Sequence, residues 1–171
     1  KVAVVELPNV SANKTDALVA KSLASVIKDS VLSVCTTTDK AEIDKAWETI
    51  NAAAKPRIQI VVPTSPIPME FVSGKKPAKM LEAIAESVAY AKSLCAEVEF
   101  SAQDATRSEM EFLLTACEKA IENGATIINL CDTAGVMLPE EFASFISEVK
   151  SKVKGIDGVK VSVTCSDELS V

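Results

Sequence analysis

The chain of 171 residues is long enough for one domain with a buried core, and 48% hydrophobic residues argue against a disordered segment. The formal net charge of −6 argues against nucleic acid or an anionic membrane surface as a partner. No apolar run is long enough to span a bilayer and no secretory signal is visible, so we expect a cytoplasmic protein. Aromatic residues make up only 4%, so the core is expected to consist of aliphatic side chains, as in parallel strands covered by helices.

Residue types that commonly carry catalysis are scarce. The sequence contains no histidine, which removes the most common metal ligand and the most common general base at neutral pH. The five cysteines include no Cys-x-x-Cys pair, so we expect free thiols in a reducing compartment. Cys35, Cys131 and Cys165 follow or end predicted strands, where three thiolates would suit Zn²⁺ or, more simply, pack in the core.

Short apolar runs alternate with segments whose apolar residues have helical spacing. The predicted strands are residues 2–5, 31–35, 58–62, 98–100, 126–130 and 159–163. The predicted helices are 16–28, 39–50, 81–94, 106–121 and a segment that starts at residue 139. Residues 63–77 contain four prolines and a glycine, so we expect a loop there.

Three of the predicted helices have recognisable starting signals. Asp39 is a plausible N-cap, and Glu42 lies three residues further on, which approaches a capping box. Thr106 and Glu109 have the spacing of a second capping box. Pro139 suits the first position of its helix, where the missing N–H is not needed.

Strict alternation of strands and helices, with no hairpin signal, predicts the α/β class and a parallel sheet with right-handed crossovers. An open doubly wound sheet and part of a (β/α)8 barrel of the TIM type both satisfy this order. The sequence lacks Gly-x-Gly-x-x-Gly after the first strand and lacks Gly-Lys-Ser/Thr, which disfavours a nucleotide-binding open sheet. A full barrel needs roughly 250 residues, so we interpret residues 1–171 as a single partial barrel with about six of the eight β/α units.

Several strand ends match one family. Residues 99–109, Glu-Phe-Ser-Ala-Gln-Asp-Ala-Thr-Arg-Ser-Glu, resemble the E-F-S-P-E-D-A-x-R-S-D/E stretch of 2-isopropylmalate synthases and homocitrate synthases. Residues 124–142 resemble their G-A-T-x-I-N-x-x-D-T-x-G-x-x-x-P-E-E-F run, and residues 64–70 resemble their T-S-P-I-H-M-E/K loop. Residues 162–170 align with S-V-H-C-H-N-D-L-G. The resemblance covers essentially the whole chain and implies strands two to seven of the family barrel, with the first strand and the last unit missing.

The resemblance implies condensation of acetyl-CoA with a 2-oxo acid, as in leucine biosynthesis. It also implies a divalent metal (Mg²⁺, Mn²⁺ or Zn²⁺) held by an aspartate of the first strand and by the two histidines of H-x-H. Thr164 and Ser166 occupy those histidine positions, and neutral hydroxyls are poor ligands for divalent metals. Pro68 replaces a loop histidine, and Gln103 replaces a glutamate with an amide that cannot carry a proton at neutral pH. We therefore predict a 2-isopropylmalate synthase-like protein without the normal metal-dependent acyltransferase activity, a pseudoenzyme.

The resemblance also suggests where substrate would bind. The candidate contacts are Thr64, Ser101, Gln103, Arg107 and Thr133. Ser101 and Thr133 match family positions that touch the oxo acid, and they could instead cap the turns that follow their strands. Arg107 could hold an anion by a bidentate contact or could pair with Asp104 or Asp132. No catalytic residue and no metal ligand is assigned.

Two other functions remain compatible with the sequence. One is an enzyme of altered chemistry that binds a small 2-oxo acid. The other is a structural or regulatory barrel fragment, because a six-unit barrel leaves two open strand edges. Such edges predict a homo-oligomer or pairing with the missing barrel segment.

Overall fold

The computed structural model describes residues 2–71 and 73–166, and within them it contains six strands and six α-helices. The strands are β1 (Val4–Leu7), β2 (Val31–Thr36), β3 (Pro56–Pro63), β4 (Glu97–Gln103), β5 (Ile127–Asp132) and β6 (Lys160–Cys165). The helices are α1 (Lys14–Val26), α2 (Lys40–Ile50), α3 (Pro66–Phe71), α4 (Pro77–Leu94), α5 (Met110–Glu122) and α6 (Pro139–Lys152). Two 3₁₀ turns, Ala105–Arg107 and Ile156–Gly158, precede α5 and β6.

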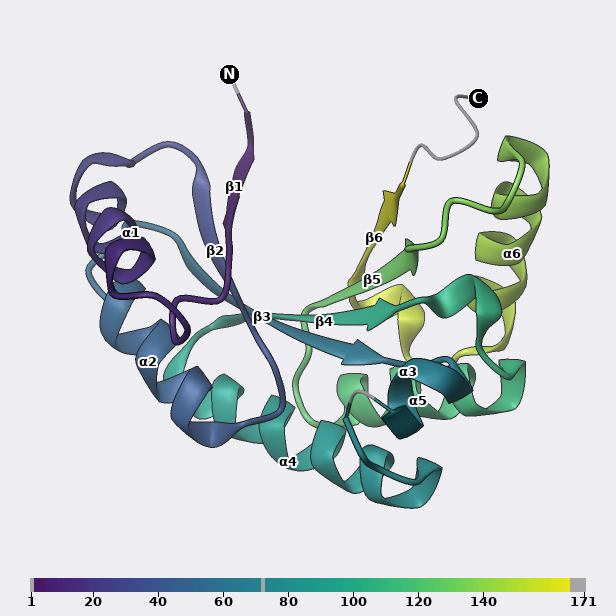
Figure 1. The fold of residues 1–171 in the computed structure, drawn as a ribbon. Coiled ribbons are helices and arrows are strands. Elements are labelled where there is room, and N and C mark those ends of the chain that lie inside the picture. Colours follow the sequence, from purple (N-terminus) through teal and green to yellow (C-terminus); the bar gives the residue numbers. More distant parts are fainter. Residues whose placement is uncertain (1, 72, 167–171) are drawn as a thin grey trace.

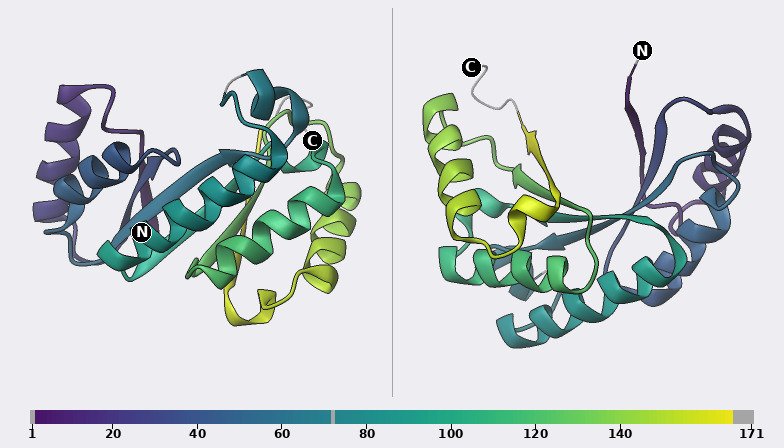
Figure 2. Two further views of the ribbon diagram at one scale, coloured as in Figure 1. Left: turned by 90° about the horizontal axis from the view of Figure 1, so that it is seen from below. Right: turned by 180° about the vertical axis from the view of Figure 1, so that it is seen from behind.

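All six strands are parallel and lie in the order β1-β2-β3-β4-β5-β6. The sheet curls, with the five longer helices on its convex outer face and the short helix α3 at the carboxyl end of β3, and β1 and β6 form the two edges of the open side (Figure 1). Figure 2 shows the same curvature from behind, with the longer helices again on the outside. The fold is therefore the partial barrel of the α/β class that the sequence predicts.

The hydrophobic core lies between the sheet and the helices. Alternate strand residues such as Ile58, Ile60, Phe100, Ile128 and Leu130 point toward the helices and are fully buried. Because side chains alternate along a strand, the residues between them face the concave inner side of the sheet. The inner-facing residues of β3 and β4 are largely polar or charged, and they build the site described below.

The loop predicted between residues 63 and 77 is partly wrong, because it contains the helix α3. Pro66 and Pro68 both lie in the first turn of α3, where no backbone N–H is required. Proline is therefore compatible with this short helix, although four prolines in fifteen residues suggested an irregular segment.

The predicted capping box at Thr106 and Glu109 is wrong. Residues Ala105–Arg107 form a 3₁₀ turn, and α5 begins after Glu109 without a side-chain cap. The Thr106 hydroxyl donates instead to Asp132 Oδ1 at the end of β5, 2.8 Å away. The other two starts agree with the sequence: the Asp39 carboxylate accepts from Ala41 N, and Pro139 occupies the first turn of α6. Glu42, however, reaches back to the backbone and hydroxyl of Thr37 and so forms no box with Asp39.

Candidate functional site

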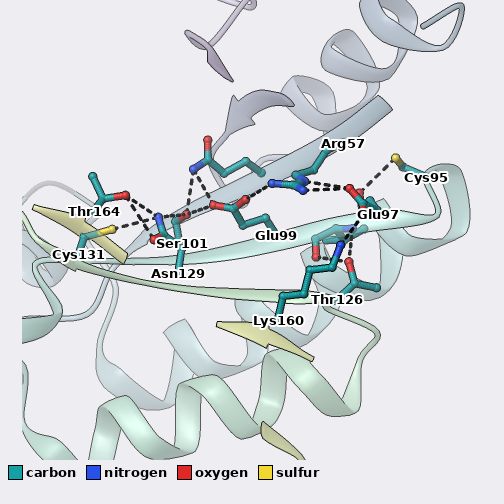
Figure 3. A network of polar contacts seen from close by, with 12 residues as sticks. Arg57, Cys95, Glu97, Glu99, Ser101, Thr126, Asn129, Cys131, Lys160 and Thr164 are labelled. Carbon is teal, nitrogen blue, oxygen red and sulfur yellow. Dashed lines mark hydrogen bonds and ion pairs between the residues drawn. The ribbon is translucent and has the colours of Figure 1, made fainter. Parts of the chain in front are cut away.

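A chain of polar contacts crosses the concave side of the sheet from β3 to β6 (Figure 3). We call it the inner network, and its members are Arg57, Gln59, Glu97, Glu99, Ser101, Asn129 and Thr164. The strand register produces it, because Arg57 lies opposite Glu97 and Gln59 lies opposite Glu99 on the neighbouring strand. Most of these side chains are buried, so each polar group requires a partner.

Arg57 anchors the network at the amino-terminal end of the sheet. Its Nη1 lies 2.9 Å from Glu99 Oε2, and its Nε and Nη2 lie 3.1 and 3.0 Å from Glu97 Oε2. The side chains of Arg57 and Glu99 are only 9% and 2% exposed, whereas that of Glu97 is 32% exposed. Burial opposes ionisation of Glu97, but hydrogen bonds from Arg57 and Lys160 outweigh it and lower the pKa of Glu97. This end of the network is therefore a structural ion-pair cluster.

Ser101, a predicted substrate contact, has no hydrogen-bonding capacity to spare. Its hydroxyl donates to Glu99 Oε1 at 3.1 Å and accepts from Gln59 Nε2 and Asn129 Nδ2 at 3.0 and 3.1 Å. A serine hydroxyl offers one donor and two acceptor positions, and all three are used. A ligand that bound Ser101 would have to break this buried network.

Thr164, which occupies the first histidine position of the H-x-H motif, is also engaged. Its hydroxyl accepts from Asn129 Nδ2 at 3.1 Å and donates to Asn129 Oδ1 at 3.3 Å. The backbone N–H of Ser166, at the second histidine position, donates to the Asp132 carbonyl at 3.0 Å. Within residues 2–71 and 73–166, no group of three or more Cys, Asp or Glu side chains is placed to hold a metal ion.

A second polar group lies at the carboxyl ends of β3, β4 and β5. We call it the rim cluster, and its members are Ser65, Asp104, Arg107 and Thr133. Asp104 is its centre: one carboxylate oxygen accepts from the Ser65 hydroxyl and the other from Arg107 Nε at 2.8 Å. Its backbone N–H donates to Thr133 Oγ1 at 2.9 Å. Asp104 has φ of 62°, and it is the one non-glycine residue with positive φ in the described part of the chain.

The remaining predicted contacts have separate surroundings. Thr64 Oγ1 donates to the Gln103 carbonyl at 3.1 Å and accepts from Ser108 Oγ at 2.7 Å, so it closes the turn beside β3. The Gln103 side chain is exposed and lines a cavity of about 570 Å³ that also contains Lys75 and Glu86. The structure thus brings Arg107 and Thr133 together but places Gln103 and Ser101 in other environments.

Asp132, at the end of β5, organises the turn before α6. Its Oδ1 accepts from Thr106, and its Oδ2 accepts from the Met137 N–H at 3.1 Å. Burial alone would raise the pKa of Asp132, but these hydrogen bonds from backbone amides and Thr106 outweigh it and lower the pKa. Asp132 is therefore an ionised structural acceptor at neutral pH, and Arg107 pairs with Asp104 rather than with Asp132.

The cysteines at the strand ends do not form the three-thiolate group considered above. Cys131 is buried on the concave side, where Asn129 Nδ2 lies 3.4 Å from its sulfur, and Cys165 is exposed beside α6. Burial raises the pKa of the Cys131 thiol to about 12, so this thiol is protonated and inert at neutral pH. All five cysteines are free, as the sequence predicts.

Most of the inner network was not predicted from the sequence, although the sequence carries a signal for it. Arg57 and Gln59 alternate with isoleucines in β3, and Glu97, Glu99 and Ser101 alternate with Val98 and Phe100 in β4. This alternation with a period of two is the signal that assigns one face to the core and the other to polar partners.

Comparison with known proteins gives a consistent family. A family model described as HMGL-like matches residues 1–171. The 2-isopropylmalate synthase of Clostridium kluyveri is 39% identical over 168 residues, which is 98% of this chain and 33% of that protein. The 2-isopropylmalate synthase of Aquifex aeolicus is 38% identical over 168 residues, again 98% of this chain and 32% of its own length. The chain thus spans about a third of the length of the curated relatives it matches.

Two solved structures share the fold at low sequence identity. Bacillus subtilis HMG-CoA lyase aligns with a TM-score of 0.77 and 13% identity, over 99% of this chain and 59% of that chain. A protein described as QR15, an aldolase, aligns with a TM-score of 0.60 and 17% identity, over 99% of this chain and 80% of that chain. These likenesses concern the backbone architecture.

Proposed function

Because the chain belongs to the HMGL-like family, we propose that it is a 2-isopropylmalate synthase-like module without the metal-dependent condensation. The relatives named 2-isopropylmalate synthase support the assignment of the scaffold to this family. They also support a small 2-oxo acid and acetyl-CoA as the ligand classes. The residues at positions 164 and 166 support the loss of the condensation.

The observation that carries the proposal is the chemistry of the donors at these two positions. The resemblance implies two imidazole ligands for Mg²⁺, Mn²⁺ or Zn²⁺, and this chain offers Thr164 and Ser166. A neutral hydroxyl is a weak divalent-metal ligand, and the Thr164 hydroxyl already makes two contacts with Asn129. The residues at these two positions therefore do not fit the family metal.

The activity test combines acetyl-CoA, 2-oxoisovalerate and each of the three metals with the purified chain. We expect no metal-dependent release of CoA thiol, because the two imidazole ligands are replaced. In isothermal titration, the double variant Thr164→His/Ser166→His should bind Mn²⁺ more tightly than the natural chain. Efficient turnover by the natural chain, or tight stoichiometric Mn²⁺ binding by it, would refute the proposal.

We also propose that the open side of the sheet is covered by a second copy or by further β/α units. Val163 on the edge strand β6 is 50% exposed, and Leu18 and Val26 on α1 are 66% and 68% exposed. A cavity of about 540 Å³ beside β6 is lined by apolar groups that include Phe142 and Ile146. Exposed strand edges with apolar surroundings favour association.

Light scattering, together with the binding of a hydrophobic dye, distinguishes between these two possible partners of the isolated chain. A dimer that dissociates in the Val163→Lys variant would identify a second copy as the partner. A monomer that binds a hydrophobic dye would favour further β/α units. A monomer without dye binding would contradict both.

A further inference from the structure

The edge strand β1 is held to the sheet by few buried side chains. In the described part of the chain it pairs with β2, and none of its four residues is buried, whereas every residue of β5 is buried (Figure 1). Val5 and Leu7 pack against the core, so Val4 and Glu6, which alternate with them, face the concave side. Elements with few buried contacts open at a low cost in free energy. The charge state of β1 is therefore expected to affect how firmly this strand is attached.

Glu6 lies in line with the charged end of the inner network. The strand register places Glu6 opposite Ser33 and Ser33 opposite Arg57. Arg57 is in turn opposite Glu97, so the four residues form one row across the sheet. The Ser33 hydroxyl is fully buried and has no hydrogen-bond partner among the described residues. Glu6 also makes no hydrogen bond and no ion pair within the part of the chain that the structure describes.

The carboxylates on the concave side outnumber the cations that pair with them. Three carboxylates face this side of β1 and β4, those of Glu6, Glu97 and Glu99. Arg57 pairs with Glu97 and Glu99, and Lys160 pairs with Glu97. Three carboxylates therefore share two cations, which leaves one negative charge in excess. Glu6 is the carboxylate without a cation.

The surroundings of Glu6 raise its pKa. Burial contributes most and the negative charge of Glu99 adds to it, while Arg57 partly opposes both. The thiols of Cys35 on β2 and Cys131 on β5 also interact electrostatically with Glu6. Burial raises the pKa of both thiols, that of Cys131 to about 12, so both are neutral at neutral pH and supply no countercharge. A proton on the Glu6 carboxyl removes the excess charge.

We propose that Glu6 makes the attachment of β1 pH-sensitive, so that protonation of its carboxyl tightens the strand on the sheet and ionisation loosens it. A carboxyl whose pKa is higher in the folded than in the unfolded chain stabilises the fold when it is protonated. This stabilisation is complete below the ordinary pKa of 4.5 and is lost as the pH rises through the raised pKa of Glu6. Glu97 and Asp132, whose pKa values are lowered, act in the opposite direction, because their stabilisation is lost as the pH falls. The inference is independent of the proposed function, since it involves no metal and no substrate.

The test compares hydrogen–deuterium exchange of the β1 amides in the natural chain and in Glu6→Gln, whose side chain is permanently neutral and of nearly the same size. At neutral pH these amides should exchange at least about twofold more slowly in Glu6→Gln, the size expected for relief of a like-charge contact between strands. Below pH 4.5, where Glu6 is protonated, the two chains should exchange equally. Comparison at the same pH cancels the chemical pH dependence of exchange. The matched control is Glu86→Gln, which neutralises an exposed glutamate on α4 and should leave β1 unchanged.

Two further measurements separate charge from a general change in stability. Val4→Lys places an ammonium two residues from Glu6 on the same face of β1, so adding Glu6→Gln to this variant should no longer slow the exchange of β1. The ¹³C signal of the Glu6 carboxyl, identified by its loss in Glu6→Gln, should titrate with a midpoint above 4.5. The inference is overturned if Glu6 titrates at or below that value, if Glu6→Gln exchanges as the natural chain does at neutral pH, or if β4 is slowed as much as β1. Persistence of the full Glu6→Gln effect beside Lys at position 4 would also contradict it.

Discussion

Replacing Arg57 with methionine is expected to lower the free energy of unfolding by about 3–5 kcal/mol, because it leaves a buried carboxylate without its partner. Arg57 Nη1 lies 2.9 Å from Glu99 Oε2, and the Glu99 side chain is 2% exposed. Gln59 and Ser101 still donate to Glu99 Oε1, but neither neutral group replaces the lost cation. Urea denaturation of the natural chain and of Arg57→Met measures the difference.

Two controls decide whether burial is the cause. Lys160→Met removes the other cation that pairs with Glu97, but the Lys160 side chain is 73% exposed, and its Nζ lies 3.3 Å from Glu97 Oε1. Its cost should stay below about 1 kcal/mol. The double variant Arg57→Met/Glu99→Met should recover most of the lost stability, because no unpaired charge remains buried. Equal losses for Arg57→Met and Lys160→Met would show that the Arg57–Glu99 pair is not the cause.

The sequence predicts the architecture because that information is local. Each strand contains a short apolar run or alternating apolar residues, each long helix has a periodic apolar face, and strict alternation of strands and helices predicts a parallel sheet. The differences occur where local signals compete, as in α3, where prolines that are typical of loops also fit the first helical turn. At Thr106 a distant partner overrides the local signal. The spacing between Thr106 and Glu109 suggests a capping box, but the Thr106 hydroxyl donates to Asp132, 26 residues away.

The site was predictable only in part, because the register between neighbouring strands and the hydrogen-bond partners of each side chain depend on residues far apart in the sequence. Arg57 and Glu99 are 42 residues apart and meet through the register of β3 and β4, which the sequence does not supply without an alignment of strands. The pairing of Arg107 with Asp104 was one of three open alternatives, beside Asp132 and a bound anion, and the i,i+3 spacing of the two residues made it accessible to sequence reasoning. That Ser101 has no free hydrogen-bonding capacity could not be predicted, because its partners come from three strands.

The two polar groups of this chain therefore have different roles. The inner network joins buried side chains from Arg57 to Asn129, and its central hydroxyl, that of Ser101, has no hydrogen-bonding capacity left for a ligand. The rim cluster is saturated around Asp104 but leaves the terminal nitrogens of Arg107 exposed. Asp104 connects the loop after β4 to Ser65 in the loop after β3, and substitutions at this position separate the cost of its positive φ from the loss of its side-chain contacts.

Asp104→Ala is expected to lower the free energy of unfolding by about 2–4 kcal/mol. Alanine pays about 1–2 kcal/mol for φ of 62°, and the buried Ser65 hydroxyl loses its acceptor at a cost of about 1–3 kcal/mol. Asp104→Gly avoids the cost of the positive φ but still removes the acceptor, so its free energy of unfolding should fall less than that of Asp104→Ala. Asp104→Asn should show the smallest decrease, because asparagine tolerates this conformation and keeps an acceptor oxygen. Urea denaturation of the three variants measures the order, with the exposed Asp157→Ala as a control expected to change stability by less than about 0.5 kcal/mol. If alanine and asparagine were equally tolerated, neither the strained backbone nor the bond to Ser65 would stabilise the rim, and Arg107 would lack a fixed support.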